Sequence, residues 1–224
     1  MTISKASLKF LKDLSKNNNR DWFNERKDEF KKHEADVKAF FQAVRKRLET
    51  HDHIERHRTY RIYRDVRFSK DKSPFKTYLG GNFVRATAAL RGGYVMSIEP
   101  DGKTRVGGGF YSPNAADLKR IRKEFEFDDT EIRSILNDKK FKMTFGELQG
   151  EGVKTAPRGF NTEHRAIDLI RKKQFYVMRK FTDKEVTQAD FIDQVNDTFL
   201  TLRPYFDYMS VILTTDLNGE SLLK

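Results

Sequence analysis

Apolar residues recur at helical spacing through the first fifty residues of the chain. Leu8, Leu11 and Leu14 lie three residues apart, which predicts a helix from Ser4 to Leu14 with these leucines facing inward. Asn19 is a favourable helix cap, and an apolar stripe follows it. The stripe consists of Phe23, Phe30, Val37, Phe41, Val44 and Leu48. This spacing predicts one long helix, or two helices that break near His33.

The middle of the chain changes to runs that favour β-structure. Three strands are expected over residues 60–68, 82–89 and 93–99. Pro100, Asp101 and Gly102 are typical of a hairpin turn, so residues 103–106 are expected to form the returning strand. Three glycines, 107–109, are expected to end that strand.

The last half of the chain returns to helical patterns with one further strand. Ser112 and Asp128 are expected to cap two helices, and Thr162 a third. Residues 156–159 suit a type I turn, with Pro157 second and Gly159 fourth. Residues 175–181 are expected to form a strand. A final amphipathic helix is expected from Thr187, with a kink or restart at Pro204.

These elements predict an α+β fold with a single domain over residues 1–224. Its central sheet is expected to be mostly antiparallel and flanked by N- and C-terminal helices. Residues 1–55 are expected to be helical, 58–110 rich in strands, and 111–224 mixed. No linker rich in serine, proline or glycine interrupts the chain.

Composition narrows the classes of function. The chain has 224 residues and no cysteine, which excludes thiolate nucleophiles, disulfides and cysteine-ligated metals. Lys5, Lys9 and Lys12 precede any long apolar run, so we expect no signal peptide. No run approaches the roughly 18 apolar residues of a membrane span. We therefore expect a cytoplasmic protein with no membrane partner, and no motif indicates a cofactor.

Positive charge is concentrated in one segment. Residues 56–76 hold eight bases and two acids, a surplus of six within a net charge of +11. The bases are Arg56, Arg58, Arg61, Arg64, Arg67, Lys70, Lys72 and Lys76. Aromatic and aliphatic residues are interleaved with them, which is typical of a packed segment rather than a disordered basic tail.

The basic segment is a candidate anion site. Planar guanidinium groups of Arg61, Arg64 and Arg67 suit phosphate or carboxylate, with Asp65 fixing their orientation. The alternative is a structural network of arginine and aspartate. In a regular strand Arg64 and Arg67 lie on opposite faces, so we expect a break at residues 65–66 that lets both reach one anion.

Two neighbouring stretches extend this candidate site. Lys72 and Lys76 are expected on a loop that orders over a ligand, although a solvated lysine loop is the alternative. Gly107, Gly108 and Gly109 precede an expected helix start, where backbone N–H groups suit phosphate. Their alternative role is a closely packed strand end. No Walker A or dinucleotide-binding motif is present.

Histidines offer little catalytic chemistry. His51, His53 and His57 lie among arginines, so we expect a polar loop there and no metal site. His164 is expected in the first turn of a helix, as a general base or phosphate donor, or simply as a surface residue. His164 and Asp65 are the only catalytic candidates.

The polar run at residues 61–77, Arg-Ile-Tyr-Arg-Asp-Val-Arg-Phe-Ser-Lys-Asp-Lys-Ser-Pro-Phe-Lys-Thr, resembles the signature of the uncharacterised domain-of-unknown-function 2461 family. Other stretches resemble that family in the same order: Asn18 with Trp22 and Phe23, residues 107–111, and residues 157–160 followed by His164. The resemblance covers about residues 8–204. It implies a one-domain intracellular protein and assigns no chemistry.

Three functions follow from these features. The first is a pocket protein, an enzyme or a binding protein, that takes a phosphorylated or anionic small molecule. Its expected ligand-binding residues are Arg61, Arg64, Arg67, Lys72, Lys76, Gly107, Gly108, Gly109 and Arg158, with His164 beside them. The second is a nucleic-acid-binding module that uses the basic, aromatic-interleaved segment. The third is a structural or interaction protein that docks a partner through its helices.

Overall fold

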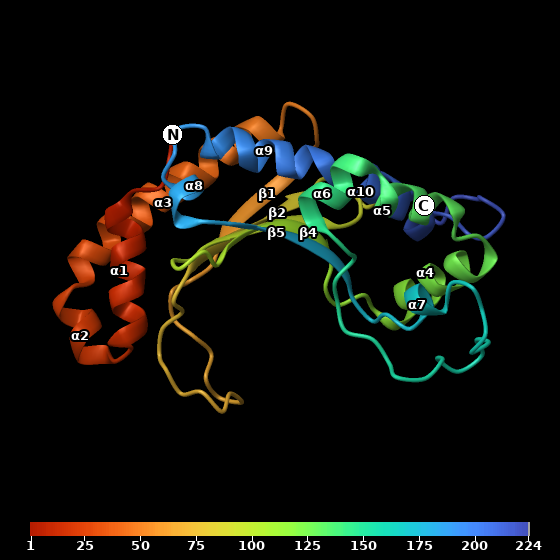
Figure 1. Ribbon diagram of the computed structural model, residues 1–224, viewed down its shortest axis with the longest axis horizontal. Helices are drawn as coiled ribbons and strands as arrows, with labels where there is room; N and C mark the ends of the chain where they lie inside the picture. The colour runs from red at the N-terminus through yellow and green to blue at the C-terminus, as the bar shows by residue number, and fades with distance from the viewer. Residues whose placement is uncertain (224) are drawn as a thin grey trace. The chain divides into compact units, whose positions relative to one another are not determined.

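A computed structural model describes residues 1–223 of the protein (Figure 1). Its helices are α1 (Lys5–Lys16), α2 (Arg20–Glu25), α3 (Lys27–Leu48), α4 (Ala115–Phe127), α5 (Thr130–Asn137), α6 (Lys139–Phe145), α7 (Ile167–Ile170), α8 (Asp183–Val186), α9 (Phe191–Thr201) and α10 (Arg203–Thr214). Its strands are β1 (Ile54–Thr59), β2 (Leu79–Arg85), β3 (Gly93–Ile98), β4 (Thr104–Phe110) and β5 (Phe175–Phe181).

The strands form one antiparallel sheet in the order β1-β2-β3-β4-β5. Each strand therefore pairs with its neighbour in the chain, and helices precede and follow the sheet. The predicted α+β class, the antiparallel sheet and the terminal helices are confirmed.

Contacts divide the described chain into two compact units. The first unit comprises residues 1–83, 95–106 and 180–197, and the second comprises residues 84–94, 107–179 and 198–223. Strands β2 to β5 each contribute residues to both units. The single-domain organisation stays a prediction.

The first unit begins with helices that follow the apolar stripe. Ser4 caps α1 by accepting the N–H of Ser7 at 3.0 Å, and Leu8, Leu11 and Leu14 are buried as predicted. The predicted helix break near His33 is wrong: the break falls at Arg26, between α2 and α3. His33 lies inside α3, where its Nδ1 is 3.1 Å from the Ser7 hydroxyl, so this part of α3 packs on α1.

The expected strand over residues 60–68 is wrong. The first strand, β1, ends at Thr59, and the following residues form an irregular loop with a single bridge between Tyr63 and Phe75. The alternation of buried and exposed side chains that a half-buried strand would show also fails there, because Phe68 is 96% exposed. The interleaved apolar residues therefore predicted correctly that some positions of the basic segment are buried, such as Ile62 and Phe75, but not that the segment pairs as a β-strand.

The hairpin between β3 and β4 is confirmed, but its second strand is longer than expected. Asp101 and Gly102 both have positive φ, 63° and 68°, as a tight hairpin turn requires. Strand β4 continues through all three glycines to Phe110, so the expectation that they end it is wrong. A Cβ at Gly107 would lie 2.0 Å from the carbonyl oxygen of Val177 in β5. The glycines therefore permit close approach of neighbouring backbone.

Helix starts in the second unit differ from those predicted. Asn114, not Ser112, caps α4. Thr162 caps no helix, because α7 begins only at Ile167 and is four residues long. The turn near Pro157 is shifted by one residue: Phe160 N–H donates to the Pro157 carbonyl, and Gly159 has φ +85°.

Of the predictions for the C-terminal part, the strand and the restart at Pro204 are confirmed, and the start of the last helix is wrong. Strand β5 spans the predicted residues, and α10 restarts at Arg203 beside Pro204. Thr187 does not open the last helix: it follows the end of α8, where its hydroxyl donates to the carbonyl of Asp183, the first residue of α8, and α9 begins at Phe191. Helix α6 was not foreseen.

Candidate functional site

The basic residues lie on a long loop of the first unit, residues 60–78, which we call the basic loop. In Figure 1 it leaves the sheet between β1 and β2 and extends well away from it. Backbone hydrogen bonds join its two arms: Lys76 N–H donates to the Ile62 carbonyl at 2.7 Å, and Arg64 N–H to the Pro74 carbonyl at 2.9 Å. The loop is therefore an irregular hairpin with a defined base.

Buried side chains fasten this base to the N-terminal helices. Ile62 and Phe75 are buried, and the Phe75 ring stacks on Phe23 of α2 with centroids 4.1 Å apart. The Asn18 side chain holds the same residue twice: Nδ2 donates to the Phe75 carbonyl at 2.9 Å, and Oδ1 accepts its N–H at 3.1 Å. Asn18 thus positions the returning arm of the loop.

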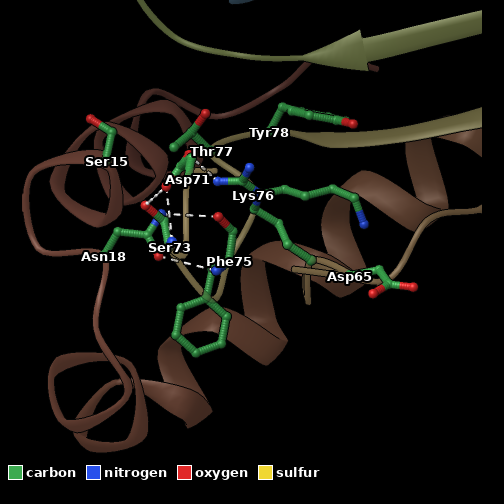
Figure 2. A pocket seen from close by; sticks show the side chains of 10 residues that line it. Ser15, Asn18, Asp65, Asp71, Ser73, Phe75, Lys76, Thr77 and Tyr78 are labelled. Carbon is green, nitrogen blue, oxygen red and sulfur yellow. Dashed lines mark hydrogen bonds and ion pairs between the residues drawn. The ribbon is translucent and has the colours of Figure 1, made fainter. Parts of the chain in front are cut away.

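A polar pocket of about 600 Å³ opens where the loop meets α1 (Figure 2). Its lining is rich in hydroxyl groups and charged groups. The lining residues are Ser15, Asn18, Arg64, Asp65, Asp71, Ser73, Phe75, Lys76, Thr77 and Tyr78. Two of the expected ligand-binding residues, Arg64 and Lys76, are therefore brought together in one cavity.

Arg64 is oriented by groups of the loop itself. Its Nη1 donates to the Asp71 carboxylate, and its Nη2 lies 3.4 Å from the Ser69 hydroxyl. Asp71 also accepts the N–H of Ser73 at 2.9 Å and its hydroxyl at 2.6 Å. Hydrogen bonds from Ser73 and Arg64 hold the pKa of Asp71 well below its usual range. Asp71 therefore remains an anion that fixes the guanidinium in place.

Lys76 sits in a desolvated and positively charged environment. Its Nζ donates to the backbone carbonyls of Arg61 and Tyr63, the latter at 3.0 Å. Burial lowers the pKa of Lys76, and the charges of Arg61 and Arg64 lower it further. The charges of Arg61 and Arg64 thus act on the same ammonium group.

Arg67 and Arg64 do not share a partner. Arg67 donates from Nε and Nη2 to Asp65, at 3.0 and 2.7 Å, and is well exposed. Asp65 lines the pocket, at the opposite side from Asp71 and Ser73 in Figure 2, whereas Arg67 does not line it. The turn falls at Arg67 and Phe68, where Ser69 N–H donates to the Val66 carbonyl at 3.3 Å, so the break expected at residues 65–66 stays a prediction. The two guanidinium groups are bonded to different carboxylates.

The other expected loop residues lie outside the pocket. Arg61 is exposed and contributes its carbonyl oxygen to Lys76. Lys72 is exposed, and its Nζ donates to the Val66 carbonyl at 3.0 Å. Their role in ligand binding stays a prediction.

The remaining candidates belong to the second unit. Gly107, Gly108 and Gly109 lie inside β4, and Arg158 is exposed in the turn that ends at Phe160. His164 precedes α7 rather than lying in its first turn, and its Nδ1 accepts the N–H of Ala166 at 3.1 Å. That bond occupies Nδ1, and the part of these residues in binding or catalysis also stays a prediction.

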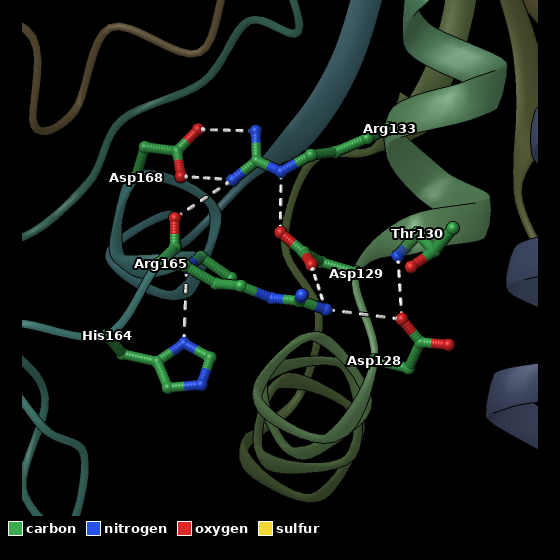
Figure 3. Close-up of polar contacts among 8 residues, drawn as sticks. Asp128, Asp129, Thr130, Arg133, His164, Arg165 and Asp168 are labelled. Carbon is green, nitrogen blue, oxygen red and sulfur yellow. Dashed lines mark hydrogen bonds and ion pairs between the residues drawn. The ribbon is translucent and has the colours of Figure 1, made fainter.

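An ion-pair cluster beside His164 was not foreseen (Figure 3). Arg133 of α5 lies between two carboxylates, with Nε 2.5 Å from Asp129 and Nη2 2.7 Å from Asp168. Arg165 lies 2.8 Å from the buried Asp129. Because each of these charges has an opposite partner within the cluster, the ion pairs fasten α5 to α7 and to the segment before α7. Asp129 and Arg133 are only four residues apart, but the pairs with Asp168 and Arg165 join residues more than 30 apart in the sequence, so no local pattern signals the cluster.

Of His51, His53 and His57, one lies in a strand. His57 belongs to β1, so the expected polar loop there is wrong for this residue. Burial, followed by the charge of Arg45, lowers the pKa of His57. Within residues 1–223, no three His, Asp or Glu side chains are placed to hold a metal ion.

Sequence reasoning missed the pocket's hydroxyl groups on Ser15, Ser73, Thr77 and Tyr78. Ser73 and Thr77 fall within the polar run that carried the family resemblance, so that run contained a signal for them. Ser15 and Tyr78 are brought in only by the fold.

Among the helices of residues 1–223, none is long and apolar enough to span a bilayer.

Comparison with known proteins agrees with the resemblance carried by the polar run. No curated protein and no solved structure matches the chain. One family model does match, over residues 6–208, and its description is "Conserved hypothetical protein (DUF2461)". The match includes all of α1 except its first residue, the whole basic loop, the sheet and the first half of α10. The chain therefore belongs to the DUF2461 family.

Proposed function

We propose that the pocket at the base of the basic loop binds a small anionic ligand that carries a phosphate group. The observation that carries this proposal is the joint presence of Arg64 and Lys76 in one polar cavity of about 600 Å³. That volume lies within the range of small-molecule sites.

The electrostatics of Lys76 support an anion over a neutral ligand. Because the charges of Arg61 and Arg64 help to lower its pKa, bringing an anion close to Lys76 would relieve their repulsion. Arg64 is already oriented by Asp71, so little side-chain entropy is lost when it donates to a ligand.

The hydroxyl-bearing lining supports a phosphate group in particular. Three phosphate oxygens accept several hydrogen bonds at once, and the hydroxyl groups of Ser15, Thr77 and Tyr78 surround the two bases. The hydroxyls of Ser15 and Thr77 donate to the Lys12 carbonyl and to Glu99 in the structure, so they would turn to a ligand only by exchanging these bonds. Asp65 and Asp71 oppose a ligand with excess negative charge. This opposition favours a ligand that also presents hydroxyl or amine donors, as phosphorylated metabolites commonly do.

The proposal is tested by titrating the protein with inorganic phosphate and with a panel of phosphorylated metabolites, using calorimetry and melting curves. Lys76→Met keeps the aliphatic stem and removes the charge. We expect it to weaken binding at least about 10-fold, because a charged hydrogen bond contributes about 1.5–3 kcal/mol. Binding should also weaken as the pH rises through the pKa of Lys76, because only the ammonium form attracts the anion.

Lys70→Met is the matched control. Lys70 is exposed on the same loop and does not line the pocket, so its loss should leave phosphate affinity nearly unchanged. The proposal is wrong if no phosphate compound shifts the melting curve, or if Lys76→Met and Lys70→Met reduce affinity equally.

A further inference from the structure

The tip of the basic loop presents an aromatic ring to solvent. Phe68 is 96% exposed, more than any other large apolar side chain in the described chain. Tyr63, on the outgoing arm, is 51% exposed, although it contacts Phe23 and Phe75. Exposing such rings costs free energy in water, and large exposed apolar groups with polar neighbours commonly mark interaction sites.

Positive charge surrounds these rings. The exposed bases of the loop outside the pocket are Arg61, Arg67, Lys70 and Lys72. The Arg67 guanidinium lies 6.0 Å from the centroid of the Phe68 ring. The loop's two acids are already paired, Asp65 with Arg67 and Asp71 with Arg64, so they weaken the positive field without reversing it.

We propose that the tip of the basic loop binds single-stranded nucleic acid. The exposed ring of Phe68 stacks on one nucleobase, the half-exposed ring of Tyr63 on the outgoing arm is available to another, and the exposed arginine and lysine side chains of the loop contact backbone phosphates. An aromatic platform beside a basic surface is the combination that single strands require, and stacking is available to every base. Sequence-independent affinity is therefore expected.

An anionic membrane is a weaker fit to the same observations. Only one large apolar side chain of the tip is almost fully exposed, and insertion of a single Phe ring provides little anchoring energy. Arg67 precedes Phe68 directly and Lys70 follows two residues later, and the charged groups of both would have to remain outside the hydrocarbon of the bilayer. A nucleic acid strand instead uses both the ring and these charges.

This inference is independent of the pocket's ligand. Phe68 and the four exposed bases do not line the pocket, and Arg64 and Lys76 are not needed for stacking at the tip. Loss of small-phosphate binding in Lys76→Met therefore says nothing about the tip, and loss of strand binding in Phe68→Ala says nothing about the pocket.

The test measures fluorescence anisotropy of a labelled oligonucleotide of about 16 nucleotides and mixed sequence, in DNA and RNA forms. We expect Phe68→Ala to weaken binding about 5- to 150-fold, the equivalent of about 1–3 kcal/mol for one stacked base. Phe68→Tyr should restore it. With about four phosphate contacts, affinity should fall about 50-fold between about 50 and 200 mM salt.

Phe127→Ala is the matched control, because Phe127 is 76% exposed but lies at the end of α4 in the second unit. It should bind the oligonucleotide as the parent does, and both variants should keep the parent melting temperature. The inference is overturned if the parent does not bind, or if Phe68→Ala and Phe127→Ala bind alike. It is also overturned if Phe68 is required only for sedimentation with phosphatidylserine vesicles.

Discussion

One arginine shows how strongly burial changes the meaning of a charged residue. The Arg85 side chain is fully buried in the second unit, although the pattern of its stretch predicted only a β-strand and no charged site. Nη2 lies 2.9 Å from Asp207, and Nη1 donates to the Arg91 carbonyl at 2.9 Å. A guanidinium tolerates such burial only when its donors are satisfied and its charge is balanced.

Removing the balancing carboxylate should therefore be costly. We expect Asp207→Ala to lower the free energy of unfolding by about 3 kcal/mol or more, because the buried Arg85 would lose the carboxylate that accepts from its Nη2. The exposed pair of Asp28 and Lys31 provides the control: Asp28→Ala should change stability by less than about 1 kcal/mol. Urea unfolding of both variants measures the difference. Equal, small losses would contradict the role assigned to Asp207.

At the scale of elements, the three glycines of β4 determine how closely neighbouring strands approach. A Cβ at Gly107 would meet the Val177 carbonyl oxygen at 2.0 Å, and one at Gly108 would meet the Gly93 carbonyl oxygen at 2.5 Å. These are backbone atoms of strands, which cannot move aside as a flexible side chain does. The glycines are therefore required by sheet packing, whether or not a ligand also contacts them.

Gly107→Ala should accordingly destabilise the sheet by about 3 kcal/mol or more, or prevent folding. Gly159→Ala is the comparison, because a Cβ there meets nothing within 4 Å and only the positive φ of 85° opposes it. That strain should cost about 1–2 kcal/mol. Circular dichroism and melting curves test both variants. If Gly107→Ala proves as stable as Gly159→Ala, close strand approach is not what β4 depends on.

Across the whole molecule, many carboxylates are held as anions by neighbouring donors. The pKa values of several aspartates lie below the usual range. In each case hydrogen bonds are the main cause of the lowered pKa: from Lys9 to Asp13, from Arg67 to Asp65, from Ser73 and Arg64 to Asp71, from Lys12 to Asp101 and from Thr130 to Asp128. A chain with net charge +11 also becomes more positive as these groups take up protons.

Stability should consequently fall in acid. A carboxylate whose pKa is lower in the folded state stabilises that state fully above its unfolded pKa, near 4, and loses this contribution as the pH falls through the folded pKa. We expect the free energy of unfolding to decrease steadily below about pH 4. Urea unfolding at a series of pH values from neutral to acid measures it. Constant or rising stability over that interval would show that these pairs do not matter to folding.

The sequence by itself determined the features that depend on neighbours along the chain. The leucine spacing of α1, the hairpin signal at Asp101 and Gly102, and the run that forms β5 each reflect local periodicity or turn geometry. The resemblance to the family, carried by the polar run at residues 61–77 and by further stretches in the same order, was likewise confirmed by the match over residues 6–208. The polar run also located Arg64 and Lys76, the two bases of the pocket.

Tertiary structure decided what depends on groups far apart in the chain. The same interleaving of bases and apolar residues suits a strand or a loop, and only contacts with Asn18 and Phe23 make it a loop with Phe75 buried and Phe68 exposed. Ser15 and Tyr78 reach the pocket for the same reason. Periodicity reports which side of an element is apolar, but the partner that covers that side is set by long-range packing, which no local pattern encodes.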